Sequence, residues 1–322
     1  MPTLKPTAQP MSKLPIVSLI AALLTVGCAQ NMRTSQTTPS QAGTSNGMSH
    51  DMSGHGIPSA ASTSASGPND PTLPPDAVHA VARLNTSTRH GQYVMIPTAK
   101  GDSIRAWIVY PERSTKAPVI VVVHEIFGMS SWIRSVTDQL AADGFIAIAP
   151  DFLTNQNLPG APDSVSLQAG VAAVSKLDMN DVQNEIDAAA KYAMALPSAL
   201  PRYGIVGFCW GGGVSFMHAV HSPTLGASVV YYGTSPKTEV LPAVKAPVLG
   251  LYGANDARVV MTIAQADSAI KAMGKTYNHE VFAGATHGFL RQQDGGANGA
   301  NLAATMQAWP ATVAWFHNYL GS

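Results

Sequence analysis

Charge is scarce in this sequence and evenly balanced. Only 12% of the 322 residues are Asp, Glu, Lys or Arg, and the 19 basic residues equal the 19 acidic ones. Without an excess of either sign, the chain has no broad field that would attract nucleic acid or an acidic surface. We therefore expect no nucleic-acid partner, and a small neutral or singly charged substrate fits this composition better.

Cysteine is also scarce, since the chain contains only Cys28 and Cys209. The first of these lies in a stretch that resembles an N-terminal leader. If that leader is removed or lipidated, Cys209 is the one thiol left in the mature domain. An intramolecular disulfide is then excluded, even in an oxidising compartment.

The leader occupies residues 1–29. Lys5 and Lys13 form a basic start, and the apolar run 14–26 follows and ends in the small residues Gly27-Cys28-Ala29. This order is typical of a signal peptide, and the run is too short to cross a membrane comfortably. We therefore expect an exported protein, either periplasmic or anchored to a membrane as a lipoprotein.

The sequence around Cys28 leaves two forms of the mature N-terminus open. Residues 24–28 resemble a bacterial lipobox, except that Thr25 stands where leucine is usual, and lipidation of Cys28 would tether the chain to a membrane. Cleavage after Ala29 would instead remove Cys28 with the leader. The long spacer that follows favours lipidation, because a tethered domain needs a flexible arm.

Residues 30–75 form that spacer. They are rich in Ser, Thr, Gly, Pro, Asn and Met, and they hold almost no apolar side chains that could offset the entropy of ordering, so we expect disorder. Within the spacer, Met48, His50, Met52 and His55 resemble the Met/His tracts that bind copper outside the cytoplasm. A single short tract is more simply polar filler, so we assign no metal site and no cofactor.

Residues 76–322 show the alternation of strands and helices that is typical of a doubly wound, mostly parallel sheet with helices on both faces. Segments 91–97 and 103–110 alternate in polarity and predict a hairpin at the sheet edge. The continuous apolar run 118–123 predicts a strand that is buried on both faces. The pattern predicts further strands over 144–149, 203–206, 227–232, 247–252 and 276–282, and helices over 130–142, 180–196, 213–220, 259–273 and 301–319.

The stretch 203–213, YGIVGFCWGGG, organises the candidate chemistry. It predicts a strand, a sharp turn and a helix, and the turn is a G-x-C-x-G version of the nucleophile elbow. The thiol of Cys209 would lie at the tip of the turn and at a helix N-terminus, which favours the reactive thiolate form. The simpler alternative is a glycine-rich turn that holds a buried cysteine.

Two later strand ends carry possible partners for Cys209. Asp256 follows the strand 247–252, and His287 follows the strand 276–282. The order of nucleophile, acid and histidine is that of α/β-hydrolases, in which the histidine moves the proton and the acid orients the imidazole. Alternatively, Asp256 caps the next helix and His287 is an ordinary loop histidine.

The strand 118–123 ends at His124-Glu125-Ile126-Phe127-Gly128. This is where an α/β-hydrolase supplies its second oxyanion donor, so the N–H groups of Ile126 and Trp210 are the candidates. The segment is not a zinc motif, because Gly128 stands where a second histidine would be needed. We interpret His218 and His221 as structural and expect no metal site.

Together these residues resemble the dienelactone hydrolases (carboxymethylenebutenolidases), over a region from about Gly91 to the C-terminus. The resemblance implies an α/β-hydrolase fold and a cysteine hydrolase with Cys209, His287 and Asp256 as its triad. It also implies that Glu125 meets the resting thiol and keeps it protonated until substrate displaces the carboxylate. It rests on His124-Glu125-Ile126-Phe127-Gly128, Ala149-Pro150-Asp151, Gly207-Phe208-Cys209-Trp210-Gly211-Gly212, Asp256 and His287-Gly288-Phe289.

Family members that cleave dienelactone bind its carboxylate through two arginines. Arg291 matches the second of these, whereas no arginine lies between Arg134 and Arg202 to match the first, and Gly288 stands where the family commonly has serine. We expect an exported, monomeric cysteine hydrolase that cleaves an activated ester or enol lactone through a thioester acyl-enzyme. The alternative is a non-hydrolytic thiol-binding or metal-binding protein on a hydrolase scaffold.

Overall fold

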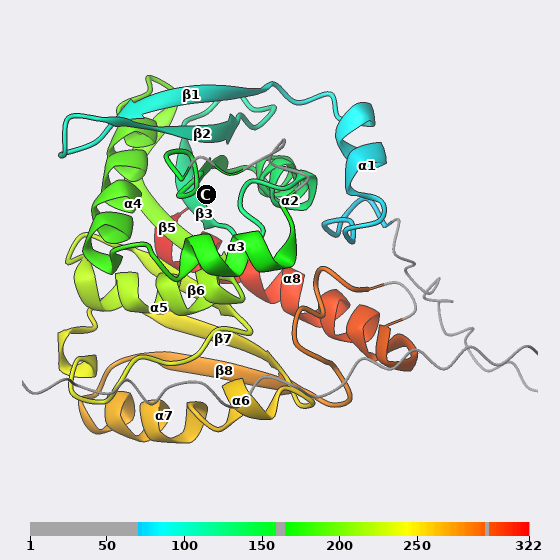
Figure 1. Cartoon of the computed structure of the whole chain (residues 1–322), viewed down its shortest axis with the longest axis vertical. Helices are drawn as coiled ribbons and strands as arrows, with labels where there is room; N and C mark the ends of the chain where they lie inside the picture. The colour runs from blue at the N-terminus through cyan, green and yellow to red at the C-terminus, as the bar shows by residue number, and fades with distance from the viewer. Residues whose placement is uncertain (1–69, 157, 159–164, 294–295, 322) are drawn as a thin grey trace, which may run out of the picture. The chain divides into compact units, whose positions relative to one another are not determined.

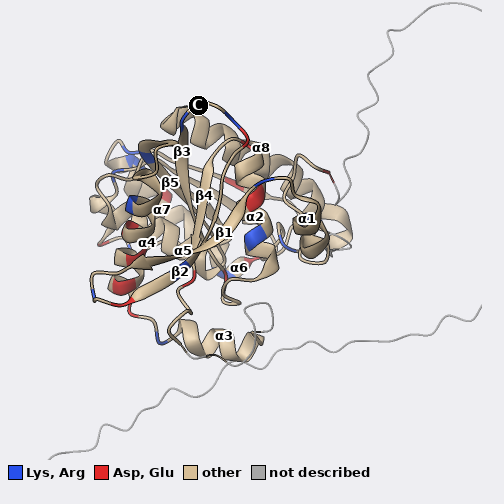
Figure 2. Cartoon of the chain, turned by 90° about the horizontal axis from the view of Figure 1, so that it is seen from above, with Lys and Arg blue, Asp and Glu red and all other residues tan. Residues whose placement is uncertain are grey.

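The computed structural model describes residues 70–156, 158, 165–293 and 296–321. The predicted signal peptide with Cys28, the Met/His tract at 48–55 and most of the predicted spacer lie outside the described residues. In the described part of the chain, no helix is both long enough and apolar enough to cross a membrane. Basic and acidic segments are scattered among neutral ones (Figure 2), as the balanced charge of the sequence leads one to expect.

An eight-stranded sheet forms the centre of the described region, in the order β1-β2-β4-β3-β5-β6-β7-β8. β1 and β2 are antiparallel to their neighbours and lie at one edge, whereas β3 to β8 are parallel (Figure 1). The predicted mostly parallel sheet with an edge hairpin is therefore confirmed. The strands are β1 (Gly91–Pro97), β2 (Ser103–Val109), β3 (Ala117–Val123), β4 (Ile146–Pro150), β5 (Ala199–Phe208), β6 (Ala227–Tyr231), β7 (Val248–Gly253) and β8 (Tyr277–Phe282).

Helices cover both faces of this sheet. α4 to α7 pack into one hydrophobic cluster, and α1, α2 and α8 pack into the other. Their bounds are α1 (Ala80–Thr86), α2 (Ser131–Ala142), α3 (Leu167–Val174), α4 (Met179–Met194), α5 (Trp210–His221), α6 (Ala257–Val260), α7 (Ile263–Ala272) and α8 (Ala300–Leu320), with short 3-10 turns η2 (Leu241–Ala243) and η3 (Gly296–Gly299).

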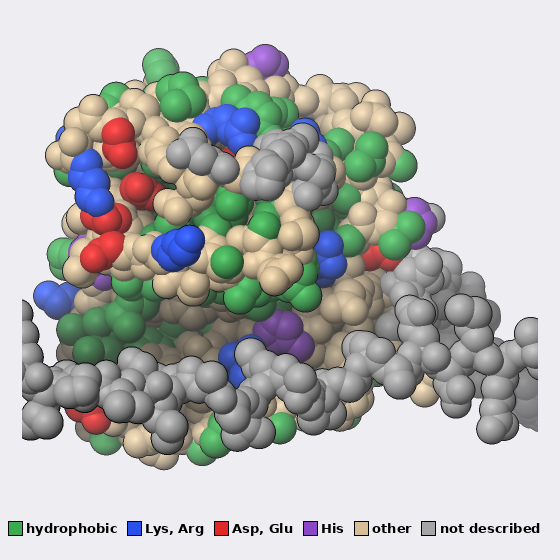
Figure 3. Space-filling view, in the orientation of Figure 1, with side chains coloured by type: hydrophobic (Ala, Val, Ile, Leu, Met, Phe, Trp, Pro, Cys, Tyr) green, Lys and Arg blue, Asp and Glu red, His purple; other side chains and the backbone are tan. Residues whose placement is uncertain are grey.

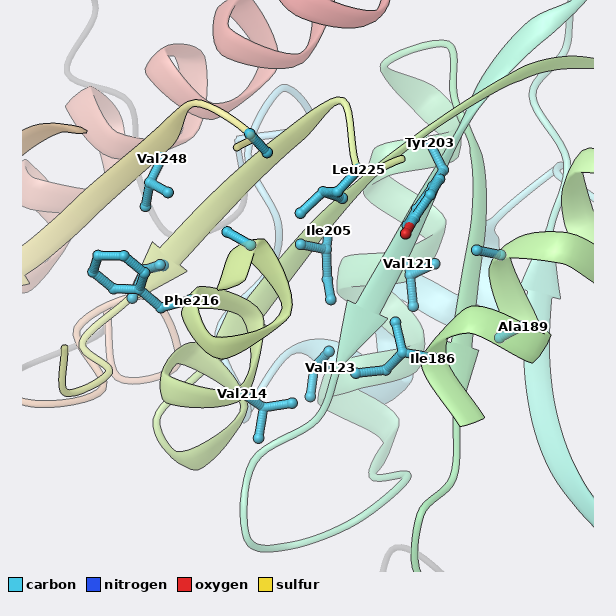
Figure 4. Packing of buried hydrophobic residues seen from close by; sticks show 14 of the residues in the cluster. Val121, Val123, Ile186, Ala189, Tyr203, Ile205, Val214, Phe216, Leu225 and Val248 are labelled. Atoms are coloured by element: carbon cyan, nitrogen blue, oxygen red, sulfur yellow. The ribbon is translucent and has the colours of Figure 1, made fainter. Parts of the chain in front are cut away.

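The central strand β3 shows why the sheet is covered on both sides. All seven of its residues are buried, because successive side chains point to opposite faces and each face has a helical layer. Val121 and Val123 join the cluster under α4 and α5 (Figure 4), whereas Ile120 and Val122 join the other cluster. Full burial of each such side chain stabilises the fold by about 1.5–3 kcal/mol.

Three details differ from the sequence-based expectation. The helices α1 and α3 were not predicted, and β5 begins at Ala199 rather than at residue 203. Pro201 and Arg202 obscured the start of that strand because they interrupt its apolar pattern. The helix predicted over 259–273 is divided into α6 and α7 by Thr262, whose side-chain hydroxyl donates to the carbonyl of Val259 at 2.7 Å.

Candidate active site

The turn between β5 and α5 holds Cys209 in a strained conformation. Its φ of 58° and ψ of −116° lie in a region that residues with a Cβ rarely occupy, and its N–H donates to the carbonyl of Tyr231 at 3.1 Å. Glycine is required on both sides: a Cβ on Gly207 would lie 1.9 Å from the oxygen of Gly211, and one on Gly211 would lie 2.5 Å from the oxygen of His124. The predicted elbow is therefore confirmed as backbone geometry.

Asp256 and His287 meet at the ends of β7 and β8. The Asp256 Oδ2 atom lies 2.5 Å from His287 Nδ1, and the Asp256 carboxylate makes no side-chain cap to α6. Only 7% of Asp256 is exposed. The capping alternative therefore does not describe Asp256, because its side chain is committed to the imidazole.

Cys209 also acts on the imidazole of His287, so side chains from the ends of β5, β7 and β8 influence one another at this edge of the sheet. Burial lowers the pKa of His287, but the hydrogen bond to Asp256 and the interaction with Cys209 outweigh this effect and raise the pKa to about 9. The imidazole of His287 is therefore protonated near neutral pH.

Glu125 is buried near His287, and only 4% of it is exposed. Its Oε2 atom is 3.1 Å from Arg291 Nε, but the N–H does not point along the hydrogen-bond direction, so the contact is an ion pair without a formal hydrogen bond. Burial raises the pKa of Glu125 to about 7, against the lowering effects of Arg291 and His287. The carboxyl group therefore changes charge near neutral pH.

The expected contact between Glu125 and the thiol is not formed as a hydrogen bond among the described residues, where the acid faces Arg291 instead. The guanidinium of Arg291 also stacks over the Phe127 ring, 4.7 Å from its centroid. These contacts join Arg291 to Glu125 rather than placing it in the open cavity described below. The roles that the resemblance implies, control of the thiol by Glu125 and substrate binding by Arg291, stay predictions.

The peptide between Glu125 and Ile126 is held by His124. The buried His124 Nδ1–H donates to the Glu125 carbonyl at 2.6 Å, and the Phe152 N–H donates to His124 Nε2 at 3.2 Å. Burial lowers the pKa of His124, which keeps the ring neutral in this tautomer. Because carbonyl and N–H point in opposite directions across a trans peptide, this contact directs the Ile126 N–H away from His124.

The two oxyanion candidates border the same space as Cys209. Among the described residues, neither the Ile126 N–H nor the Trp210 N–H has a hydrogen-bond acceptor. The helix α3 packs against both residues, and a Cβ on Gly170 of α3 would lie 2.0 Å from the Ile126 oxygen. Both N–H groups are therefore free to bind developing negative charge.

Tyr232 is a site residue that the sequence analysis missed. It follows β6 directly with a φ of +40°, and its ring packs edge-on against His287 at a centroid distance of 5.1 Å. Burial raises its pKa well above 10, helped by the negative charges of Glu125 and Cys209. Its buried hydroxyl has no hydrogen-bond partner among the described residues, so a neutral donor is left unused beside the thiol.

A cavity of about 510 Å³ opens at Cys209. Its apolar lining comes mainly from Ile126, Met179, Trp210, Val214 and Met217, and its polar rim from Thr234, Ser235, Lys237 and Arg258. Figure 3 shows a groove across this face of the molecule, with hydrophobic side chains along it and histidine and basic side chains at one end. The cavity therefore has room for a small, partly apolar molecule.

The histidines of α5 lie outside this cavity. His218 is buried, with Nδ1 at 2.6 Å from Gln183 Oε1 and Nε2 at 3.0 Å from the Tyr203 hydroxyl, and burial lowers its pKa to about 3. His221 faces Asp187 at 3.2 Å. In the part of the chain that the structure describes, no three His, Cys, Asp or Glu side chains are grouped so that they could hold a metal ion.

Comparison with known proteins agrees with this architecture. The family model of the dienelactone hydrolase family matches residues 104–320. Curated relatives named "Putative carboxymethylenebutenolidase" include one from Salmonella typhimurium, 33% identical over 239 residues (69% of this chain, 86% of the relative), and one from Escherichia coli K12, 31% identical over 245 residues (71% and 87%).

Solved structures show the same likeness. A crystal structure from Klebsiella pneumoniae, described as a "Putative Dienelactone Hydrolase", superposes with a TM-score of 0.64 at 29% identity and covers 72% of this chain and 100% of its own. A dienelactone hydrolase from Anabaena variabilis gives a TM-score of 0.55 at 19% identity, covering 72% and 98%, which supports the fold alone.

Proposed function

Because this chain belongs to the dienelactone hydrolase family, we propose that it hydrolyses its substrate with Cys209 as the nucleophile, through a thioester acyl-enzyme. The observation that carries this proposal is the meeting of Cys209, His287 and Asp256 at the carboxyl ends of β5, β8 and β7, with His287 bonded to Asp256. Cys209 stands at the strained tip of an elbow, beside a cavity and two free N–H groups. No other cysteine lies in the described region.

The proposed reaction begins with attack of the Cys209 thiolate on the carbonyl carbon. The oxygen takes up the negative charge and is stabilised by the N–H groups of Ile126 and Trp210. When the tetrahedral intermediate collapses, the C–O bond to the leaving group breaks and the protonated His287 donates its proton to that oxygen. Neutral His287 then removes a proton from water, which attacks the thioester and releases the acid and the thiol.

A cysteine nucleophile restricts the substrates that can react. The tetrahedral intermediate expels its better leaving group, and a thiolate, whose parent thiol ordinarily has a pKa of about 8.5, leaves far more readily than an alkoxide. Attack on an alkyl ester therefore mostly reverses. An aryl ester, a thioester or an enol lactone has a leaving group stable enough to compete, so we propose that the natural substrate is one of these activated classes.

Rapid-mixing kinetics with a 4-nitrophenyl ester test this function. We expect a burst of 4-nitrophenol equal to the enzyme concentration, followed by slower turnover, and a covalent acyl adduct on Cys209 by mass spectrometry. Cys209→Ala should lose both. Hydrolysis that survives Cys209→Ala, or alkyl esters cleaved as fast as aryl esters of like size with acylation limiting, would contradict the proposal. A thiol that forms no acyl adduct would favour a non-hydrolytic binding protein.

We also propose that the protein is exported and tethered through a lipid on Cys28. The support comes from the basic and apolar leader and from the lipobox-like residues 24–28. Cell fractionation with labelled fatty acid should place the processed chain in the membrane fraction. Cys28→Ala should release it or block its processing, and an unprocessed chain in the cytoplasm would contradict the proposal.

A further inference from the structure

A short segment just before α1 is buried in the domain. Its composition predicts a continuation of the spacer, yet Leu73 is 4% exposed, Asp76 is 1% exposed, and the two prolines between them are buried as well. The family match begins only at residue 104, so the segment lies ahead of it. We call residues 73–77 the strap; in Figure 1 it is the cyan chain that leads into α1 beside α2.

Three successive carbonyl groups of the strap each accept a side-chain N–H. Two of them belong to prolines, which have no N–H of their own to satisfy when they are buried. The donors come from α1, from the loop after β8 and from α2: Arg83 Nη1 to Leu73 at 3.3 Å, Gln293 Nε2 to Pro74 at 2.9 Å, and Trp132 Nε1 to Pro75 at 3.1 Å. The strap is therefore fastened to two helices and to the loop that follows β8.

That loop begins with a turn over residues 287–291, which carries the histidine of the proposed triad. The N–H groups of Arg291 and Gln292 both donate to the carbonyl of Gly288 at 3.0 Å and close the turn. The strap holds its other end, because the N–H of Ala77 donates to the carbonyl of Arg291 at 3.0 Å. The backbone that carries the histidine is thus bonded directly to the strap.

Gln293 and Leu73 strengthen this joint. Gln293 is 1% exposed, and its Nε2 donates both to the carbonyl of Pro74 in the strap and to that of Leu290 in the turn, each at 2.9 Å. The side chain of Leu73 belongs to the same buried apolar cluster as Phe289 and Leu290. Strap and turn are therefore joined by hydrogen bonds and by apolar packing.

We propose that the strap is a positioning element of the active site: it fixes the turn 287–291, so that His287 stays bonded to Asp256 and Arg291 stays against Glu125. The inference rests on the proposed function, in which His287 transfers the protons. Both side chains leave the backbone of this turn, and their contacts are close, 2.5 Å to Asp256 and 3.1 Å to Glu125. A misplacement of about 1 Å can cost up to roughly a hundredfold in rate.

Substitutions on the two sides of the joint test the strap. Gln293→Met keeps the length of the side chain and removes both donors, whereas Leu73→Ala removes apolar contact and no hydrogen-bonding group. Each should lower kcat/KM for a 4-nitrophenyl ester about tenfold. The double variant should lose little more, because both substitutions release the same joint.

The pH profile separates positioning from general destabilisation. Activity that needs protonated His287 falls as pH rises through its pKa of about 9, and the bond to Asp256 raises that pKa. A displaced imidazole loses part of this bond, so the alkaline limb of kcat/KM should move to lower pH in both variants. The groups that face His287 keep their identity in these variants: Asp256, Cys209, Glu125 and Tyr232.

Leu225→Ala is the matched control. Leu225 is 6% exposed, belongs to the other apolar cluster and precedes β6, at the opposite edge of the sheet from Cys209. The same truncation there should destabilise the fold yet leave kcat/KM and the alkaline limb unchanged at a temperature where all variants are folded. An unmoved limb in the strap variants, or an equal shift in Leu225→Ala, would overturn the proposal.

Hydrogen exchange tests the joint without turnover. Relative to a peptide of β3, the peptide 287–293 should exchange faster in Gln293→Met and in Leu73→Ala than in wild type, but not in Leu225→Ala. Unchanged exchange in both strap variants would overturn the hold of the strap on the turn. A wild type that exchanges as expected but shows no burst with the ester would count against the proposed function alone.

Discussion

The Glu125 carboxylate lies 3.1 Å from the Nε of Arg291, and both groups are withdrawn from the cavity that Cys209 borders. An acid that is 4% exposed and has a pKa of about 7 can be charged or neutral during turnover. Arg291 favours its charged form, whereas burial favours its neutral form. The charge of this buried pair therefore depends on pH near neutrality.

Glu125→Gln should speed alkylation of Cys209 by iodoacetamide near neutral pH. The substitution removes a negative charge from the surroundings of the thiol, and such a charge opposes thiolate formation. Glu280→Gln, at an exposed position on β8, is the control and should not change the rate. An unchanged or slower rate in Glu125→Gln would remove Glu125 from this role.

The same variant should change how stability depends on pH. The pKa of Glu125 rises from 4.5 in the unfolded chain to about 7 in the fold, so its contribution to stability is fully present below pH 4.5 and is lost as pH rises through 7. Urea unfolding at pH 5 and pH 8 should show Glu125→Gln gaining relative to wild type, by up to ~3 kcal/mol. A constant difference would contradict the raised pKa.

Asp256→Asn should lower the pKa of His287, because it removes the strongest interaction that raises it. We expect kcat/KM for an aryl ester to fall by roughly 10²-fold, the scale of acid–base catalysis by a positioned side chain. The raised pKa of His287 stabilises the fold below pH 6.5, an effect lost as pH rises through 9. The stability deficit of the variant should therefore be largest at low pH, whereas Asp267→Asn should leave activity unchanged.

Tyr232→Phe should leave the fold as stable as wild type or more stable. The hydroxyl is buried without a partner among the described residues. Such an unsatisfied group lowers the free energy of unfolding by about 1–3 kcal/mol. If the hydroxyl serves substrate or the charged intermediate, kcat should fall while thermal stability holds. A clear loss of stability would show instead that the hydroxyl has a structural partner.

The sequence was most informative where local pattern and geometry coincide. The continuous apolar run of β3 and the glycines around Cys209 each express a constraint that a few neighbouring residues impose. The meeting of Asp256 with His287 also followed from sequence, since parallel strands end at one edge of a sheet.

Other features depend on residues far apart in the chain and left no local signal. Pairing of Glu125 with Arg291 joins two distant loops, one after β3 and the other after β8. The positive φ of Tyr232 is not readable from an aromatic residue, although its place directly after a strand was a usable hint. The helix α3 leaves Leu167 and Val171 exposed, so it lacks the apolar face that periodicity detects.

The contact of Gly170 with the Ile126 carbonyl links the cover of the site to its chemistry. Ile126 thus has a contact on each side: His124 holds the peptide that carries its N–H, and α3 packs against the peptide that carries its carbonyl. Only a residue without a side chain lets α3 lie this close to the loop after β3, so even Gly170→Ala would force either the helix or the Ile126–Phe127 peptide to move.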